Sequence, residues 1–445
     1  MKRKKTGLES RCAAAQVLAK VEQKKAFAAP LLEEALRSKA GETVPDRRLI
    51  TELAYGALRV RPWLEARAQV YAPRGVGSLD PLSRAHLLIG VYQLFFSRIP
   101  PFAAVNTAVQ AVTDLRGKAV ASFINAILRK LARDAAQEGT ISKEEAFRES
   151  SAPWVVEKLI TAIGEEAARS FLYDAANIPP LCLRIENAQE RDQWLVRFQQ
   201  LMPHTTFALG RFSPYALLVE KGGGVQRLVG WDQGKWSIQE EGSQIVPLTL
   251  GVRPGDTVLD VCAGRGGKTA LLIRAAGHQG AVDASDVSPS KLKMLVDELK
   301  RLHLSPRDCF QRDWTQKEGI LRVYQRILVD APCSGIGTLR RRPDLMLRRG
   351  EEGLGDLPAL QLAIAEHAAA QLARGGRMVY AVCSILREEG EEVIERLLQR
   401  MPALQLVHFE EGIGQMLAGV SPFLRLLPSV HGTDGYFLAS LRKID

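Results

Sequence analysis

The sequence predicts a multidomain protein in which an all-α N-terminal domain and a small α+β piece precede a C-terminal doubly wound α/β domain. Three observations predict this order. Apolar residues recur at helical spacing over most of residues 9–135. Residues 257–286 contain a strand, a glycine turn, a helix and a second strand that ends in an acid. The length of 445 residues is also sufficient for two or three domains, each with its own core.

Amphipathic helices account for the N-terminal prediction. Two of them place their apolar residues on one face each, namely Ala14, Val17, Leu18 and Val21 in the first, and Leu49, Leu53, Ala54 and Ala57 in the second. Residues 85–96 are nearly all apolar, which is typical of a buried helix, and this run is too short to span a bilayer. Residues 137–152 are polar and are predicted to form a linker.

The middle piece is predicted from a few local signals. Residues 181–185 have the composition of a strand, and residues 191–201 that of a helix. The run Gly222-Gly223-Gly224 indicates a loop. We therefore expect a domain of residues 1–145, a linker with a small α+β subdomain of residues 146–236, and a catalytic domain of residues 237–445.

The C-terminal domain is predicted to alternate strands and helices. The expected strands are 257–261, 281–285, 308–311, 326–330, 377–382 and 435–441, and the expected helices are 268–276, 289–303, 357–372 and 388–400. Polar and reactive residues collect where the first five strands end. Open α/β sheets bind their ligands at the carboxyl ends of their strands, so the functional site is expected there.

Charge is distributed unevenly along the chain. Residues 1–150 contain 25 Lys and Arg against 15 Asp and Glu, whereas the other residues contain 35 of each kind. The net charge of +10 therefore lies in the first third of the chain. Such asymmetry favours a polyanionic partner such as nucleic acid, and a basic surface that only promotes solubility is the alternative.

Cysteine spacing and the N-terminus bear on localisation. The six cysteines contain no C-x-x-C pair, which argues against a zinc ribbon or a disulfide framework and favours a reducing cytosol. The basic start, residues 2–5, has no apolar run behind it and therefore does not resemble a secretory signal. We expect a cytoplasmic protein without a bound metal or a membrane segment.

The glycine turn predicts a nucleoside site. It contains Cys262, Ala263, Gly264, Arg265, Gly266 and Gly267 and is followed by Lys268. A phosphate-binding P-loop would need a glycine where Cys262 stands, and the dinucleotide pattern G-x-G-x-x-G is not completed. Asp286, at the end of the next strand, can accept hydrogen bonds from ribose hydroxyls. Alternatively, the turn is only a tight connection and Asp286 only caps the next helix.

Two further strand ends carry thiols. One predicted strand runs into Asp330-Ala331-Pro332-Cys333-Ser334-Gly335, and the next one ends in Tyr380-Ala381-Val382-Cys383-Ser384. A single cysteine in an apolar strand usually only packs in the core. Two cysteines at the ends of neighbouring strands can instead face one cleft, which favours a catalytic role.

These segments resemble the RNA (cytosine-5)-methyltransferases that use S-adenosyl-L-methionine, most closely the bacterial group that acts on small-subunit (16S) ribosomal RNA, called Fmu or Sun. The Cys-Ser strand end, the Asp-Ala-Pro-Cys-Ser turn, the run Arg340-Arg341-Arg342-Pro343-Asp344 and the run Gly432-Thr433-Asp434-Gly435-Tyr436-Phe437 carry this resemblance. The N-terminal region resembles the NusB-like RNA-binding domain through Asp46-Arg47-Arg48-Leu49, Glu52-Leu53-Ala54-Tyr55-Gly56 and Asn125-Ala126-Ile127-Leu128-Arg129. The helical region could alternatively serve only to dock on the rest of the chain.

The sequence departs from the family pattern at a few positions. Gly264-Arg265 replaces the usual Ala-Pro of the cofactor turn, which could alter the affinity for the cofactor. Val382 stands where the family has a threonine before the second cysteine. The usual Leu-Arg-x-Asn is here Leu183-Arg184-Ile185-Glu186, which leaves the RNA contact of the middle piece open.

The resemblance implies a Rossmann-like methyltransferase domain and a role for each motif. Cys383 would attack carbon 6 of cytosine, Asp330 would contact the ring nitrogen N3, and Cys333 would take part in release of the product. The cofactor would contact the turn residues Cys262 to Lys268, with Asp286 at the ribose, Asp313 near the adenine and Asp330 beside the reacting base. Arg340, Arg341 and Arg342 would bind the RNA backbone, unless they are only a solvated surface cluster.

The expected function is therefore transfer of a methyl group from S-adenosyl-L-methionine to carbon 5 of a cytosine in 16S ribosomal RNA. An exposed base in a loop or single strand is the expected target. We expect a monomer whose partner is small-subunit ribosomal RNA. The alternatives are the same chemistry on transfer RNA, and a non-catalytic RNA-binding protein for assembly or antitermination.

Overall fold

The structure is a computed structural model that describes residues 7–137, 141–221, 228–317, 319, 322–348, 354–410 and 412–444. The basic start at residues 2–5 and the glycine run at residues 222–224 lie outside these residues. The chain forms two compact units, of which the first contains residues 1–156, 172–178 and 339–350 and the second contains the rest. Among the described residues, no helix has the combination of length and apolar character that a membrane span requires.

The first unit confirms the prediction of an all-α N-terminal domain. Its helices are α1 (Leu8–Lys24), α2 (Ala28–Arg37), α3 (Val44–Arg59), α4 (Arg61–Gln69), α5 (Pro81–Phe96), α6 (Pro101–Arg116), α7 (Lys118–Gln137), α8 (Lys143–Ser150) and the short α15 (Leu345–Arg348). The apolar faces predicted for the first two helical patterns are buried, except that Leu49 is partly exposed.

Small residues set the spacing of the helices in this unit. A Cβ atom at Gly56 in α3 would lie 2.2 Å from the hydroxyl oxygen of Tyr92 in α5. At Gly90 in α5, a Cβ atom would lie 2.9 Å from the δ-carbons of Leu128 in α7. A larger residue at Gly56 would overlap the Tyr92 ring, and one at Gly90 would require Leu128 to shift, so both helix pairs pack closely at these glycines.

The prediction of a linker over residues 137–152 is wrong, because α8 lies within it. A capping box begins this helix: the Glu145 amide donates to Ser142 Oγ, and the Ser142 amide donates to Glu145 Oε2, each at 3.1 Å. Ala146 and Phe147 are buried. The polar composition of this segment did not predict the helix, because α8 is stabilised by the capping box at its start and by the burial of Ala146 and Phe147.

The second unit begins with the small α+β piece that was predicted. After α9 (Pro153–Ile163) and α10 (Glu165–Ala175), its antiparallel sheet has the order β2-β3-β1-β4 and is covered by α11 (Arg191–Leu201). The strands are β1 (Leu181–Ile185), β2 (Thr206–Leu209), β3 (Ala216–Lys221) and β4 (Trp236–Ile238). Trp194, Phe198, Phe207 and Trp236 belong to its core. The sequence predicted β1 and α11, but not the other three strands.

The larger sheet of this unit has the order β10-β12-β9-β8-β5-β6-β7, with β11 paired to β12. Strands β5 to β9 are parallel, whereas β10, β11 and β12 are antiparallel additions at one side. The strands are β5 (Thr257–Asp260), β6 (Ala281–Asp286), β7 (Asp308–Gln311), β8 (Tyr324–Asp330), β9 (Leu372–Val382), β10 (Leu404–Leu406), β11 (Phe423–Leu426) and β12 (Tyr436–Lys443). This mixed sheet confirms the α/β class of the C-terminal domain.

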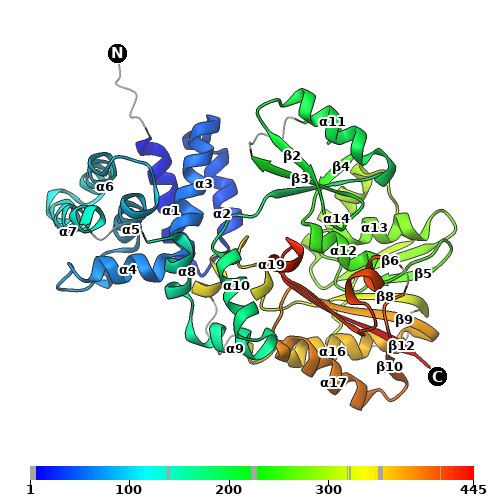
Figure 1. Cartoon of the computed structure of the whole chain (residues 1–445). Coiled ribbons are helices and arrows are strands. Elements are labelled where there is room, and N and C mark those ends of the chain that lie inside the picture. Colours follow the sequence, from blue (N-terminus) through cyan, green and yellow to red (C-terminus); the bar gives the residue numbers. More distant parts are fainter. Residues whose placement is uncertain are drawn as a thin grey trace. The chain divides into compact units, whose positions relative to one another are not determined.

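Helices cover both faces of this sheet. They are α12 (Glu241–Leu248), α13 (Gly267–Ala276), α14 (Pro289–Arg301), α16 (Leu357–Ala370), α17 (Glu391–Arg400), α18 (Ile413–Ala418) and α19 (Pro428–His431). Figure 1 shows α16 and α17 on one side of the strands and α12 to α14 on the other. Alternate strand residues serve the two cores, so that Ile327 and Val329 face α16 while Leu328 belongs to the core with α12 and α13.

The structure corrects the predicted bounds around the fifth strand. A helix to residue 372 and a strand from residue 377 were expected, but α16 ends at Ala370 and β9 already begins at Leu372. The pairing of β8 with β9 shifts between Tyr324 and Arg326, and Gly375 in this shift has a φ of 73°. Gly375 and Gly376, which lie between the expected helix and the expected strand, therefore form an irregularity inside β9.

Candidate active site

The glycine turn connects the end of β5 to α13 and is bent back toward β6. Gly264 and Gly266 have φ values of 60° and 83°, which glycine adopts without strain. A Cβ atom at Gly266 would lie 2.9 Å from Leu295 Cγ in α14, whereas a Cβ atom at Gly264 would have no atom within 4 Å. The turn therefore packs on one side and is open on the other. Arg265 is exposed, and burial raises the pKa of the Cys262 thiol, which favours its neutral form.

The first of two carboxylates beyond the turn is Asp286, which is buried at the end of β6. Its Oδ2 accepts a hydrogen bond from the Gly264 amide at 3.1 Å, and its Oδ1 accepts one from the Ser288 amide at 2.9 Å. The second bond closes a turn just before α14 and is not a cap on this helix, because the N-cap residue is Ser288 and no side chain caps it. The first bond attaches the glycine turn to β6. Asp313, beyond β7, accepts bonds from the amide and hydroxyl of Thr315, and these bonds lower its pKa.

Asp260, the last residue of β5, is a buried carboxyl group that the sequence analysis did not assign to the site. Thr269 Oγ1 donates to its Oδ2 at 2.7 Å, while its buried Oδ1 has no hydrogen-bond partner among the described residues. Burial raises the pKa of Asp260 to about 7. A buried oxygen without a hydrogen-bond donor is typical of a binding site in which the ligand supplies the missing donor.

Lys268 and Asp330 form an ion pair across the turn. Lys268 Nζ lies 2.6 Å from Asp330 Oδ2, so the first residues of α13 are joined to the end of β8. Burial is the largest single effect on the pKa of Lys268 and acts to lower it, but the charge and hydrogen bond of Asp330, together with the charges of Asp260 and Cys383, outweigh burial and raise this pKa. The ammonium group also interacts favourably with a negative charge on Cys383. A cation in this position favours a thiolate.

The two predicted thiols face each other. Cys333 Sγ and Cys383 Sγ are 3.1 Å apart, and neither residue is in a disulfide. The neighbouring parallel strands β8 and β9 bring them together, because Asp330 is in register with Ala381. The hydrogen bond with Cys383, followed by burial, raises the pKa of Cys333 well above its usual value. Cys333 therefore retains its proton.

The Leu-Arg-Ile-Glu segment of β1 is attached to the glycine turn. Arg184 is fully buried and donates to the carbonyl oxygen of Gly267 and to Gln239 Oε1, both at 2.5 Å. Glu186 Oε1 accepts from the same guanidinium at 2.6 Å, and its Oε2 accepts from Arg274 at 2.9 Å. The segment thus supports the start of α13 rather than exposing an arginine to solvent.

The arginine cluster after the Cys333 turn belongs to the first unit. Arg340 is buried and its carbonyl oxygen accepts a hydrogen bond from Arg59 at 2.6 Å. Arg341 is partly exposed and Arg342 is exposed. Solvent therefore reaches Arg341 and Arg342, and the assignment of all three to RNA stays a prediction.

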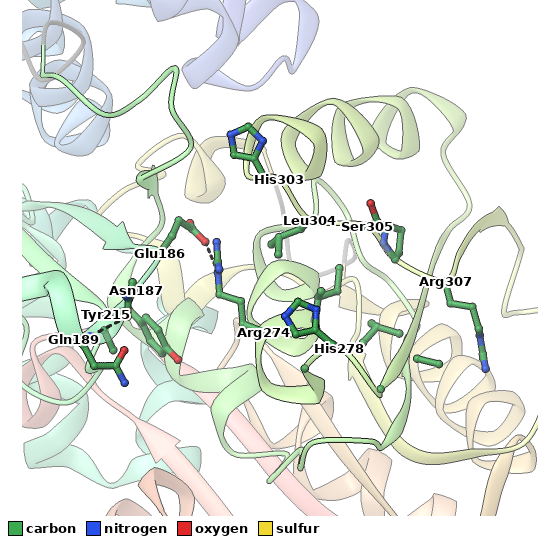
Figure 2. Close-up of a pocket in the computed structure, with 17 residues that line it drawn as sticks. Glu186, Asn187, Gln189, Tyr215, Arg274, His278, His303, Leu304, Ser305 and Arg307 are labelled. Carbon is green, nitrogen blue, oxygen red and sulfur yellow. Dashed lines mark hydrogen bonds and ion pairs between the residues drawn. The ribbon is translucent and has the colours of Figure 1, made fainter.

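A separate cavity of about 740 Å³ opens at the other end of the strands (Figure 2). Ala281 and Val282, at the start of β6, line it together with Glu186, Arg274 and the loop before β7. The described residues around this cavity include none of the catalytic or cofactor residues predicted from the sequence. The position of the cavity at the amino ends of the strands distinguishes it from the site built on Asp260, Asp286 and the two thiols.

Two models of protein families match the chain. The model described as 16S rRNA methyltransferase RsmB/F matches residues 247–442, and the NusB family model matches residues 8–133. The probable ribosomal RNA small subunit methyltransferase B of Synechocystis sp. is 32% identical over 409 residues, which are 90% of this chain and 92% of that protein. The ribosomal RNA small subunit methyltransferase B of Vibrio vulnificus is 32% identical, with coverage of 97% and 99%.

Solved structures share the fold. PH0851 superimposes with a TM-score of 0.80 at 22% identity, over 98% of this chain and 99% of that chain. The structure of NSun6 from Pyrococcus horikoshii with SFG has a TM-score of 0.57 at 18% identity and covers 66% of this chain and 98% of that one. The first similarity includes both units.

Proposed function

Because this chain belongs to the RsmB/F family of 16S rRNA methyltransferases, we propose that it methylates carbon 5 of a cytosine in small-subunit ribosomal RNA through a covalent adduct on Cys383. The observation that carries the proposal is the 3.1 Å separation of Cys333 Sγ and Cys383 Sγ at the ends of adjacent parallel strands. Two adjacent thiols suit a reaction that first adds a sulfur to the base and later expels it.

The side chains of the site fit S-adenosyl-L-methionine. Asp260 Oδ1 is a buried acceptor without a partner among the described residues and suits a cationic amino group. The carboxylate of Asp286 suits ribose hydroxyls, and the space beside Gly264 allows a ligand to approach the backbone. When bound, this cofactor supplies a methyl group on a positively charged sulfur.

Residues of the chain would carry out the attack on the base, the contact with its ring nitrogen and the release of the product. The Cys383 thiolate, favoured by the nearby ammonium of Lys268, adds to carbon 6 and makes carbon 5 nucleophilic. Asp330 would contact N3 and favour its protonation as the adduct forms. After methylation, a base accepts the proton from carbon 5, and the electron pair of that C–H bond re-forms the double bond between carbons 5 and 6 as Cys383 leaves as a thiolate. N3 then gives up the proton that it had gained, which restores the neutral ring, and Cys333 takes part in this release. Because carbon 6 is not accessible within a helical stack, the cytosine must be turned out.

Substitution of each cysteine tests the proposal. Cys383→Ala should abolish methyl transfer to 16S ribosomal RNA while cofactor binding, measured by calorimetry, stays within about twofold, since the sulfur contacts the base rather than the nucleoside. Cys333→Ala should accumulate a protein–RNA adduct that survives denaturing electrophoresis. Methyl transfer by Cys383→Ala at the wild-type rate would show that the nucleophile is another residue.

A further inference from the structure

We propose that Glu389 is a positioning residue for product release, because its buried carboxylate holds the turn that carries Cys333 against the strand that carries Cys383. The inference rests on the proposed function and adds a residue to which the sequence patterns gave no role. Glu389 ends the 3₁₀ helix Arg387–Glu389 between β9 and α17, and it is 0% exposed.

The carboxylate is bonded directly to the Cys333 turn. Its Oε1 accepts from the Ser334 amide at 2.7 Å, and its Oε2 accepts from Ser334 Oγ at 2.5 Å. Gln361 Nε2, from α16, donates to the same Oε1 at 2.9 Å and to the carbonyl oxygen of Pro332 at 3.0 Å. The residues on both sides of Cys333 are therefore held by one carboxylate and one amide.

The main chain of Glu389, rather than its carboxylate, is attached to the strand that carries Cys383. The hydroxyl of Tyr380 in β9 donates to the Glu389 carbonyl oxygen at 2.7 Å. Ser334 Oγ and Ser384 Oγ are 3.3 Å apart, so the residues that follow the two cysteines also meet. Displacement of the turn by about 1 Å would disturb the 3.1 Å contact between the two sulfur atoms.

A buried carboxylate is not needed to hold two strands together, because apolar residues do so without the cost of removing a charge from water. Its charge acts on the thiol as well. The groups that face Cys333 are Cys383, Glu389, Asp330 and Tyr380. Cys383 and burial contribute most to the raised pKa of Cys333, and Glu389 and Asp330 add to it. The carboxylate thus holds the Cys333 turn in place and also favours the protonated form of the Cys333 thiol.

The test compares Glu389→Ala with Glu389→Gln in the full chain and uses 16S ribosomal RNA. Glu389→Ala should lower turnover about 100-fold, the cost of a misplaced group, and should accumulate the denaturation-resistant adduct while cofactor binding is retained. Glu389→Gln can still accept from the Ser334 amide and should recover turnover to within about tenfold of the wild type. If Glu389→Ala does not fold, Ser334→Ala removes one of the same bonds and should accumulate the adduct.

Asp283→Ala is the matched control, because Asp283 is equally buried and accepts bonds from Arg307, Arg322 and Tyr324 earlier in β6. This variant should lose thermal stability without accumulating adduct. In a Cys333→Ala background, Glu389→Ala should change turnover and adduct level by less than about twofold, since its effect passes through Cys333. The inference is overturned if Glu389→Ala lowers turnover by the same factor in the Cys333→Ala background as in the wild type. It is also overturned if Glu389→Ala turns over at the wild-type rate. Failure of Cys333→Ala itself to trap an adduct would instead contradict the proposed function.

Discussion

At the residue scale, the carboxyl group of Asp260 combines full burial with an oxygen that no described residue bonds. Such an arrangement costs stability in the absence of a ligand, because the oxygen has lost its water without gaining a donor. It lies at the end of β5, directly before the glycine turn. Asp260 therefore joins Asp286 and Lys268 as a residue whose environment is suited to ligand binding rather than to stability.

This environment predicts a dependence of stability on pH. Burial raises the pKa of Asp260 from 3.8 to about 7, so the native protein holds a proton that the unfolded chain releases. The stabilisation is complete below pH 3.8 and is lost as the pH rises through about 7. The unfolding free energy of the wild type, compared with that of Asp260→Asn, should fall by a few kcal/mol (roughly 3) between pH 4 and pH 8. Urea unfolding of both proteins measures this difference, and a constant difference would contradict the raised pKa.

At the scale of elements, the short 3₁₀ helix Ile336–Thr338 fixes the end of β9 against the start of β12. The Gly337 amide donates to the Cys383 carbonyl oxygen at 3.1 Å, and the Gly435 amide donates to the Gly337 carbonyl oxygen at 2.8 Å. A Cβ atom at Gly337 would lie 2.0 Å from the Gly435 carbonyl oxygen and 2.9 Å from that of Cys383. Backbone atoms cannot move aside as a flexible side chain can.

Gly337→Ala should therefore destabilise the protein by about 1–3 kcal/mol and displace Cys383 enough to lower methyl transfer. Thermal unfolding and the methylation rate measure the two effects. Gly77→Ala is the matched control, because Gly77 also stands in the middle of a 3₁₀ helix, Val76–Ser78, and its Cβ would meet only Arg84 Nη1 at 3.8 Å. Equal effects of the two substitutions would show that the contact with Cys383 is unimportant.

At the scale of the whole molecule, the excess of positive charge lies in the N-terminal third. Two of these cations, Arg129 and Arg133, are exposed one turn apart on α7, and Arg129 belongs to the segment that resembles the NusB family. We infer that this domain contributes phosphate contacts to RNA binding. These contacts are expected to release counterions and to weaken binding as salt increases.

Replacement of both residues, Arg129→Gln with Arg133→Gln, should reduce the slope of log affinity against log salt by about 1.4. Filter binding of 16S ribosomal RNA at several salt concentrations measures the slope. Lys293→Gln with Lys300→Gln removes the same charge from exposed positions on α14 and should change the slope less. A larger change in the control would assign the RNA contacts to the catalytic domain.

The sequence alone predicted the local features of this protein. The bounds of β1, β7 and α11 agree with it, because a proline or another turn-forming residue stands close to an end of each segment. It also predicted that Asp286, Asp330, Cys333 and Cys383 stand at strand ends, since all parallel strands of such a sheet end at the same edge. It missed α8 and the irregular start of β9, where a cap and a bulge outweigh composition.

Only the tertiary structure decided which distant groups meet. Lys268 pairs with Asp330 and Arg184 bonds to Gly267, and Glu389 joins Ser334 to Gln361. These bonded partners are at least 28 positions apart along the chain, so no local pattern contains them. Spacing within a strand or helix is set by backbone geometry, whereas side chains from different elements are brought together by packing of the whole sheet. For that reason the reactive residues were predictable, and the groups that hold them in place were not.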